Sequence, residues 1–320
     1  MPLAVYTITH PWVQSVVREV RDEIAPEWDV AFLKPGDQAG AQTLLPKADA
    51  LLCLKCSAEW IGLLDRCKLV QHNGVGYDGI DRVALNDRGI PLAITPVGTA
   101  VGVAEHVFML MLSLSKQLLP VHKSLQNGTW EMMGWRANST WVHQRTLGIV
   151  GLGRIGKRVA HLAHAFGTKT LYTDIVPMPA ELEERYALER VELDELIERS
   201  DIVTVHVPLT EKTNGMFGSA EFERMKSDAL FINASRGETY DMDALYNALV
   251  AGQLRGAGLD VFNPEPPNQH PILYLDNVVA TSHIASGTIE RQYAIVRAQF
   301  ENFQRALRGE AVEDQIIFGG

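Results

Sequence analysis

Cysteine is scarce in this 320-residue chain, which contains only Cys53, Cys56 and Cys67. An odd, sparse set argues against a disulfide framework and fits a reducing compartment. Cys53 and Cys56 have the Cys-x-x-Cys spacing, but no second pair exists to complete a tetrahedral zinc site. Because Cys53 ends an apolar run instead of opening a helix, we interpret these residues as small buried thiols and expect no metal centre.

The sequence also lacks a long uninterrupted hydrophobic run. Its most apolar stretch, residues 101–120, contains Glu105, His106 and Lys116, so the uncharged part is too short to span a bilayer and predicts a buried helix. The chain starts with a strand-like run at residues 3–8 and no basic region precedes an apolar one. We therefore expect no secretory signal and a cytoplasmic location.

An excess of positive charge is missing as well. Lys and Arg number 29 against 39 Asp and Glu, a net charge of −10, which argues against nucleic acid or an anionic membrane as partner. The hydrophobic fraction of 46% is that of a globular protein, and 320 residues exceed the size of a usual single core. Two domains are therefore expected.

Short apolar runs alternate with helical patterns in two series, which predicts parallel sheets with right-handed crossovers. We expect an α/β fold with two doubly wound parallel-sheet domains. A helix over residues 101–119 is expected to link the series, and a last helix over about 286–308 could return to the first. The expected strands lie near residues 4–8, 29–33, 50–53, 69–72 and 91–94, then from 147 and near 170–173, 201–206, 229–233, 256–260 and 277–281, with early helices such as 11–25 and 81–88.

The run Gly151-Leu-Gly153-Arg-Ile-Gly156 follows an apolar strand and begins an amphipathic helix, the context in which Gly-x-Gly-x-x-Gly indicates dinucleotide binding. Gly151 permits the sharp turn, Gly153 lets bare backbone approach a pyrophosphate, and Gly156 lets the helix pack on the sheet. The amides near Arg154 and Ile155, at the positive end of the helix, are expected to face the phosphates.

An acid, Asp174, closes the next apolar run. It is expected to accept hydrogen bonds from the adenosine ribose hydroxyls. Ile175, Val176 and Pro177 supply no cation for a ribose 2′-phosphate, and the carboxylate would repel one, so NAD is favoured over NADP. The alternative is a glycine turn of an ordinary α/β protein that binds no nucleotide.

Polar groups follow almost every strand of the second series. Ligands of open parallel sheets bind beyond the carboxyl ends of the strands, so this convergence predicts an active site there. The groups are Gly151, Asp174, His206, Ser235 with Arg236, Asp260 and His283.

Two of these groups, with one loop acid, suit acid–base chemistry on a small anion. Arg236 can fork onto a carboxylate and polarise a carbonyl. His283 can exchange one proton near neutrality, and Glu265 could orient its imidazole and raise its pKa, or be a solvated loop acid. Asp260 either accepts from the nicotinamide carboxamide or caps its strand, and His206 is interpreted as structural, its backbone lining the cofactor cleft. The remaining histidines, including His10, His72 and His106, are interpreted as core or surface residues.

Residues 126–144 carry many large apolar side chains. A subunit interface or an active-site cover would explain them, because large exposed aromatic side chains are costly. Burial against their own domain is the alternative. The side chains are Trp130, Met132, Met133, Trp135 and Trp141.

Together these features resemble the D-isomer-specific 2-hydroxyacid dehydrogenase family over nearly the whole chain. The resemblance implies Arg236, Glu265 and His283 as the catalytic set, and the amides of Val75 and Gly76 as the holder of the substrate carboxylate. The motifs, besides the glycine run, are Asn73-Gly-Val-Gly-Tyr-Asp-Gly-Ile-Asp81, Val103-Ala-Glu-His106, His206-Val-Pro-Leu-Thr210, Asn233-Ala-Ser-Arg-Gly237, Gly258-Leu-Asp-Val-Phe262 and Ser282-His-Ile284.

The resemblance further implies a homodimer that uses NAD and a small 2-keto or 2-hydroxy acid. Residues 1–98 and 286–320 would form a discontinuous, flavodoxin-like substrate domain, and residues 99–285 a Rossmann-type NAD domain. The candidate cofactor residues are Gly151, Gly153, Arg154, Ile155, Gly156, Asp174, His206, Pro208, Ser235 and Asp260. The candidate substrate residues are Lys55, Val75, Gly76, Arg236 and Ser286.

Two departures from the family pattern qualify these expectations. The familiar basic-hydroxyl loop is Leu54-Lys-Cys-Ser57 here, so Lys55 is only a candidate substrate contact, and specificity is expected in loops near Lys55, Trp60 and Trp135. The chain ends at Gly320 without the regulatory module of some phosphoglycerate-oxidising members, so phosphoglycerate is not favoured.

Two other functions remain open. Formate or phosphite oxidation occurs on the same fold, but formate oxidation needs no acid–base pair, so Glu265 with His283 favours hydroxy acids. A non-catalytic NAD sensor would resemble the C-terminal binding corepressors, which carry disordered extensions for partners. This chain stops close to its predicted last helix, and turnover would distinguish an enzyme from a sensor.

Overall fold

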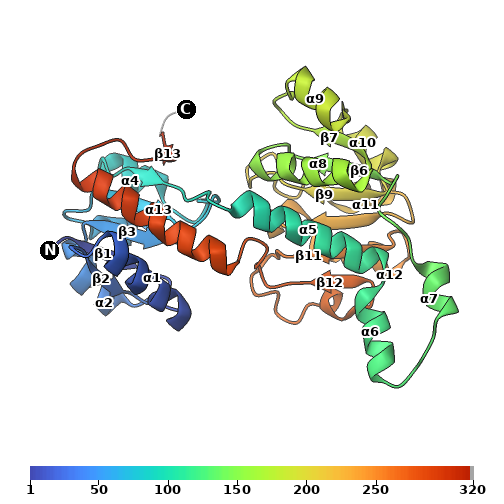
Figure 1. Ribbon diagram of the computed structural model, residues 1–320, viewed down its shortest axis with the longest axis horizontal. Coiled ribbons are helices and arrows are strands. Elements are labelled where there is room, and N and C mark those ends of the chain that lie inside the picture. The colour runs from blue at the N-terminus through green and yellow to red at the C-terminus, as the bar shows by residue number, and fades with distance from the viewer. Residues whose placement is uncertain (318–320) are drawn as a thin grey trace. The chain divides into compact units, whose positions relative to one another are not determined.

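The structure is a computed structural model that describes residues 1–317. The chain forms two compact units, Met1–Thr99 with Gly287–Gly320, and Ala100–Ser286. Each unit has one sheet with helices on both faces, which confirms the predicted α/β fold of two doubly wound parallel sheets (Figure 1). Among the described residues, no helix is both long and apolar enough to cross a membrane.

The first unit contains strands β1 (Leu3–Tyr6), β2 (Asp29–Phe32), β3 (Ala50–Cys53), β4 (Leu69–His72), β5 (Leu92–Ala93) and β13 (Gln315–Ile316). Its helices are α1 (Pro11–Ile24), α2 (Gln38–Leu44), α3 (Ala58–Gly62), α4 (Arg82–Asp87) and α13 (Ile289–Leu307), with a 3-10 turn η1 (Leu45–Lys47).

The sheet of the first unit has the order β13-β5-β4-β3-β1-β2, parallel except for β13. Side chains of β1 alternate between two cores: Val5 packs with α2, α3 and α4, whereas Ala4 and Tyr6 pack with α1 and α13. This alternation follows from the two-residue period of a strand that is buried on both faces.

The second unit contains strands β6 (Thr146–Val150), β7 (Lys169–Thr173), β8 (Leu188–Arg190), β9 (Ile202–Val205), β10 (Leu230–Asn233), β11 (Gly256–Leu259) and β12 (Val278–Ala280). Its helices are α5 (Thr99–Ser115), which begins at the boundary, α6 (Leu118–Gln126), α7 (Met133–Asn138), α8 (Arg154–Phe166), α9 (Ala180–Tyr186), α10 (Leu193–Arg199), α11 (Ser219–Arg224) and α12 (Met242–Val250), with 3-10 turns η2 (Gly237–Thr239) and η3 (Pro271–Tyr274).

The seven strands of the second sheet are all parallel, in the order β12-β11-β10-β9-β6-β7-β8. The chain adds strands to one side of β6 and then, from β9, to the other side. The carboxyl ends of β6 and β9 therefore border the point where the strand order reverses, which is where open α/β sheets bind ligands.

Some sequence expectations are wrong. The helix predicted over residues 101–119 ends at Ser115, because Gln117 adopts a left-handed φ of 54° and α6 starts at the next residue. The buried face of α5 is as expected, but Val101 and Met109 are each 43% exposed. Two edge strands, β8 and β13, were not predicted, since runs of three and two residues carry no readable period.

The interpretation of the cysteines is confirmed, because all three are buried and free. Trp60, one of the residues near which loops of specificity are expected, is itself buried. Its side chain is 7% exposed in the core beneath α3, and its indole N–H donates to Gln38 Oε1 over 3.2 Å.

Candidate active site

The glycine turn at the end of β6 is shaped by contacts inside the second unit. Gly151 has a φ of 92°, and a Cβ there would lie 2.9 Å from the carbonyl of His206. A Cβ on Gly156 would overlap the carbonyl oxygen of Gly151. A Cβ on Gly153, in contrast, would meet no atom of the described residues within 4 Å, so their packing does not require glycine there. The room above Gly153 fits the close approach of a pyrophosphate.

Two backbone N–H groups near the start of α8 point to an anion at this helix end. Gly153 caps the helix and supplies no side-chain hydrogen bond. In the described chain, the N–H groups of Ile155 and Gly156 have no acceptor. Uncapped N–H groups and the helix dipole together attract phosphate, so this end of α8 fits the diphosphate of a dinucleotide.

Asp174 lies at the end of β7, next to the glycine turn. Its Oδ2 accepts the N–H of Leu152 over 2.5 Å, and its Oδ1 accepts the N–H of Val176 over 2.9 Å. Sequence reasoning found no cation near this acid. The structure places one there, since Arg190 Nη2 donates to the backbone oxygen of Asp174 over 2.9 Å. The prediction missed Arg190 because it missed β8.

His206 follows β9, and its backbone lies against Gly151. The imidazole Nε2 lies 3.0 Å from Thr204 Oγ1, while Nδ1 is buried without a partner among the described residues. Burial lowers the pKa of His206 to about 3, so the ring is neutral at working pH. Pro208 is exposed, and its carbonyl accepts the hydroxyl of Thr213 over 2.6 Å.

Two candidate catalytic residues meet in the second unit. His283 Nδ1 lies 2.9 and 3.1 Å from the two carboxylate oxygens of Glu265. Glu265 Oε1 also accepts the N–H of Phe262 over 3.1 Å, which fixes the carboxylate. The side chains are 50% and 40% exposed, so Nε2 of His283 can reach a ligand. A carboxylate that holds one ring nitrogen leaves the other for proton transfer.

Asp260 organises the loop that carries His283. The Asp260 side chain is fully buried, and its Oδ1 accepts the Thr281 hydroxyl over 2.6 Å and the N–H of Ile284 over 2.9 Å. Its Oδ2 accepts the N–H of Ala285 over 2.8 Å, and its backbone oxygen accepts the N–H of His283 over 2.8 Å. These bonds hold the loop of residues 281–285 against the end of β11.

His106, on α5, extends this network. Its Nε2 lies 2.9 Å from Thr281 Oγ1. Because the Thr281 hydroxyl donates to Asp260, the hydrogen between His106 and Thr281 must belong to His106 Nε2. Burial lowers the pKa of His106, and the charge of Asp260 opposes that shift. The sequence reading treated His106 as a core or surface residue; its place next to Glu105 in a family motif was the available signal.

Arg236 lies in the turn after β10. Its Nη1 donates to the carbonyl of Ser235 over 2.7 Å, and its own carbonyl accepts the hydroxyl of Thr239 over 2.7 Å. A Cβ on Gly237 would overlap the carbonyl of Phe262, so this turn packs directly on the start of the loop that carries Glu265. The Arg236 and Glu265 loops are therefore neighbours.

Two other candidates of the second unit occupy supporting positions. Ser235 donates from its N–H and hydroxyl to Asn233 Oδ1 over 2.9 and 2.8 Å, which tightens the Arg236 turn. The segment that contains Ser286 approaches α5 at Gly102, where a Cβ would lie 3.2 Å from the carbonyl of Ala285 and 3.3 Å from Cα of Ser286.

Two further candidates, Val75 and Gly76, lie in the first unit on the loop 73–76 after β4. The N–H of Thr95 donates to the carbonyl of Gly74 over 3.0 Å, which holds the loop against β5. Within the described residues, the N–H groups of Val75 and Gly76 have no acceptor. Two adjacent free amides can bind one carboxylate.

His72 and Lys55 flank this loop. His72 Nδ1 accepts the N–H of Gly74 over 2.9 Å, so this histidine braces the loop, a role that the sequence did not reveal. Lys55 is exposed and packs beside Gly79, where a Cβ would lie 2.8 Å from its Cγ. The structure thus places Lys55 beside Gly79, three residues after the loop 73–76.

Comparison with known proteins agrees with a dinucleotide-binding dehydrogenase. Residues 108–285 match the family described as D-isomer specific 2-hydroxyacid dehydrogenase, NAD binding domain. The chain is 43% identical over 239 residues to glyoxylate/hydroxypyruvate reductase B of Citrobacter koseri, covering 74% of each protein. It is 37% identical over 263 residues to D-3-phosphoglycerate dehydrogenase of Methanocaldococcus jannaschii, covering 82% of this chain and 50% of that relative.

A solved structure is similar over the whole chain. The complex of an acyclic imino acid reductase with NADPH and D-Arg has a TM-score of 0.85 and 26% identity, with 99% of this chain and 100% of that chain covered. The chain therefore belongs to the D-isomer specific 2-hydroxyacid dehydrogenase family and contains its NAD-binding domain.

Proposed function

We propose that the protein transfers a hydride between a nicotinamide cofactor and a small D-2-hydroxy acid or 2-keto acid. The supporting observation is the hydrogen bond of 2.9 Å between His283 and Glu265 in the unit that carries the glycine turn. Hydroxy-acid oxidation must remove a proton from oxygen, and keto-acid reduction must supply one. Formate oxidation needs neither step, so this pair favours hydroxy acids.

Each proposed catalytic residue has a distinct role. NADH, when bound, supplies the hydride. His283 then donates a proton from Nε2 to the alkoxide that develops on the substrate, and Glu265 orients the ring and stabilises its charged form. Arg236 binds the substrate and polarises its carbonyl. On the first unit, the amides of Val75 and Gly76 bind the substrate carboxylate. Lys55 of the same unit and Ser286 of the second unit are further proposed contacts.

The cofactor is proposed to bind along the carboxyl ends of β6, β7 and β9. The α8 N-terminus binds the diphosphate, and Asp174 accepts from the adenosine ribose, which favours NAD over NADP. Residues 1–98 and 286–320 are proposed as the substrate domain, and residues 99–285 as the cofactor domain. The proposed cofactor contacts are Gly151, Gly153, Arg154, Ile155, Gly156, Asp174, His206, Pro208, Ser235 and Asp260.

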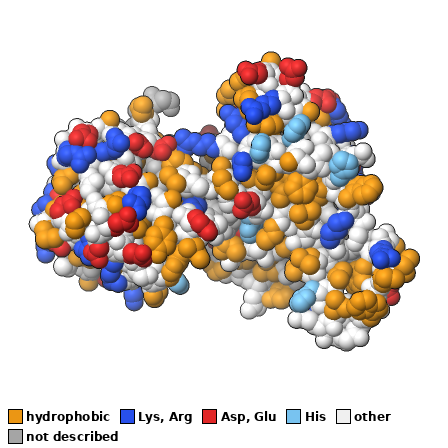
Figure 2. Space-filling model, viewed as in Figure 1, with side chains coloured by type: hydrophobic (Ala, Val, Ile, Leu, Met, Phe, Trp, Pro, Cys, Tyr) orange, Lys and Arg blue, Asp and Glu red, His pale blue; other side chains and the backbone are white. Residues whose placement is uncertain are grey.

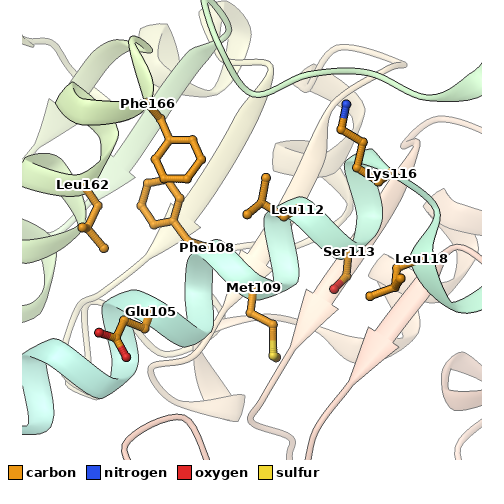
Figure 3. A pocket seen from close by; sticks show the side chains of 9 residues that line it. All are labelled: Glu105, Phe108, Met109, Leu112, Ser113, Lys116, Leu118, Leu162 and Phe166. Atoms are coloured by element: carbon orange, nitrogen blue, oxygen red, sulfur yellow. The ribbon is translucent and has the colours of Figure 1, made fainter.

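We also propose a homodimer. Trp130 is 82% exposed and Trp141 65%, so burial against their own domain does not explain the aromatic segment. Figure 2 shows hydrophobic side chains gathered over α5, α6 and α7. Beside them lies an apolar groove, shown in Figure 3, where the ring centroids of Phe108 of α5 and Phe166 of α8 are 4.7 Å apart. Exposed apolar patches of this kind favour a protein partner, and Leu118→Glu should shift the dimer to monomer in light scattering.

The three free thiols support a reducing location, and we propose the cytoplasm. Burial raises the pKa of Cys67 to about 12, which keeps this residue a protonated, unreactive thiol. Alkylation of the native protein by iodoacetamide should therefore leave Cys67 unmodified at pH 8.

The function is tested by steady-state turnover of glyoxylate, hydroxypyruvate, pyruvate, phenylpyruvate and branched 2-keto acids with NADH and NADPH. At least one 2-keto acid should be reduced. His283→Ala should lower kcat by roughly a hundred- to ten-thousandfold, the usual contribution of general acid catalysis, while the Kd for NADH stays the same. Wild-type turnover by this variant, or NADH binding without turnover by the native protein, would contradict the proposal.

A further inference from the structure

An arginine on the C-terminal helix of the first unit, Arg291, is buried beneath the loop 73–76. It is only 9% exposed. Its Nε and Nη2 donate to Thr99 Oγ1 over 3.3 and 2.9 Å, and Nη2 also approaches the carbonyl of Asn73 at 3.4 Å. Figure 1 shows α13, the helix that carries it, lying along the first sheet. All the acceptors of this guanidinium are neutral.

Within residues 1–317, no carboxylate pairs with this charge. Among the described residues, Arg291 forms no ion pair within 4.0 Å, whereas Arg297 on the same helix pairs with Glu23 at 2.7 Å. Burial lowers the pKa of Arg291 to about 10, with no opposing charge to offset the shift. A buried charge without a counter-ion destabilises a fold, so a neutral residue would suit a purely structural role better.

The surroundings form a built pocket for the arginine stem. Gly98 has a φ of 69°, and a Cβ there would lie 3.1 Å from Arg291 Cγ. A Cβ on Gly74 would lie 3.9 Å from Arg291 Nη2. Gln299, also on α13, donates to Asn73 Oδ1 over 3.0 Å. The guanidinium is thus held directly against the loop whose Val75 and Gly76 amides lack acceptors.

We propose that Arg291 is a positioning residue of the anion site on the loop 73–76, and that a substrate carboxylate bound there is its counter-ion. Arg291 fixes the Asn73 carbonyl, which sets the direction of the next two amides, and its charge adds to their attraction for an anion. This inference rests on the proposed function, because it assigns the loop a carboxylate-bearing substrate.

Oxalate, a non-reacting dicarboxylate, tests the inference without turnover. Isothermal titration calorimetry of the full chain with NADH should show oxalate binding that is about ten- to a hundredfold weaker in Arg291→Met, the range of a lost charged hydrogen bond. Arg291→Lys keeps the charge but not the planar guanidinium with its several donors, and its oxalate affinity should fall about three- to tenfold. The matched control is Arg88→Met, an exposed arginine that also donates to backbone carbonyls, at 3.0 and 2.9 Å.

Kinetics separate positioning from general damage. For the 2-keto acid reduced best, both Arg291 variants should raise KM while kcat and the Kd for NADH change by less than about threefold. Equal oxalate affinity in the wild type and Arg291→Lys would overturn the inference, and this test remains valid if Arg291→Met does not fold. The protein could reduce no 2-keto acid and still bind oxalate in a way that depends on Arg291. That result would support the anion site and refute only the proposed reaction.

Discussion

Cofactor choice should depend on one carboxylate, that of Asp174. Replacing it with asparagine keeps the size and one acceptor oxygen, so the N–H of Leu152 or Val176 still has a partner. The charge alone is removed. Arg190, already 2.9 Å from the backbone oxygen of Asp174, then becomes the dominant charge at this end of β7.

The size of the effect follows from two terms. A hydrogen bond from a ribose hydroxyl to an ionised acceptor contributes about 1.5–3 kcal/mol, so NADH should lose roughly ten- to a hundredfold in kcat/KM. A carboxylate about 4 Å from one charge of a 2′-phosphate repels it by about 1 kcal/mol in water and more in a partly buried site. The kcat/KM for NADPH should therefore rise about fivefold or more. The ratio of kcat/KM for NADH to that for NADPH should fall by at least about fiftyfold.

The assay compares kcat/KM for NADH and NADPH at saturating keto acid. Asp276→Asn is the control, since that side chain is 85% exposed and distant in sequence from the turn. Arg190→Ala in the Asp174→Asn background should remove the gain for NADPH. An NADH to NADPH ratio that Asp174→Asn leaves unchanged would refute the assignment of Asp174 to the ribose.

Three further predictions concern the histidines of the second unit. Glu265→Gln keeps a hydrogen bond to His283 but removes an attraction that, at 2.9 Å, is worth at least about 1.4 kcal/mol in water, so kcat should fall at least about tenfold in single-turnover assays while NADH affinity holds. The pKa of His206 is about 3 in the folded protein and 6.5 in the unfolded chain, so as the pH falls the unfolded chain binds the proton first. The free energy of unfolding should therefore be highest above pH 6.5 and fall by up to about 1.4 kcal/mol for each pH unit below it. Urea unfolding at pH 7, 6 and 5 should show this slope in the wild type and a flatter one in His206→Gln. His106→Leu removes the donor to Thr281 and should lower kcat about tenfold, with partial recovery in His106→Gln; equal kcat in both variants would argue against a positioning role.

The buried parallel strands of the fold could be predicted from the sequence. The strands over residues 50–53 and 69–72 were placed at their observed ends, because buried parallel strands are short apolar runs bounded by turn residues. The break after Ser115 could not be read. Gln117 adopts a left-handed conformation without glycine, and helix α6 starts on leucines that continue the apolar pattern. The break is visible only in the backbone.

Contacts between residues that are distant in sequence are the part of the candidate site that the sequence could not predict. The convergence of polar strand ends predicted a site at one edge of the second sheet, since parallel strands share one carboxyl edge, and the structure brings His283 and Glu265 together. It could not reveal Arg190, whose strand is three residues long, nor Arg291, which meets Asn73 only after α13 returns to the first unit. A residue 218 positions away has no spacing that sequence periodicity can detect.

The conformation of His283 shows why local sequence is insufficient at this site. Its φ of 54° is left-handed, which costs a non-glycine residue roughly 1 kcal/mol or more. Hydrogen bonds from three consecutive N–H groups, those of His283, Ile284 and Ala285, to Asp260 offset that cost. Asp260 is buried, and these bonds together with that of Thr281 satisfy its two carboxylate oxygens. The direction of the imidazole is thus set from β11, through hydrogen bonds that span more than twenty residues of sequence.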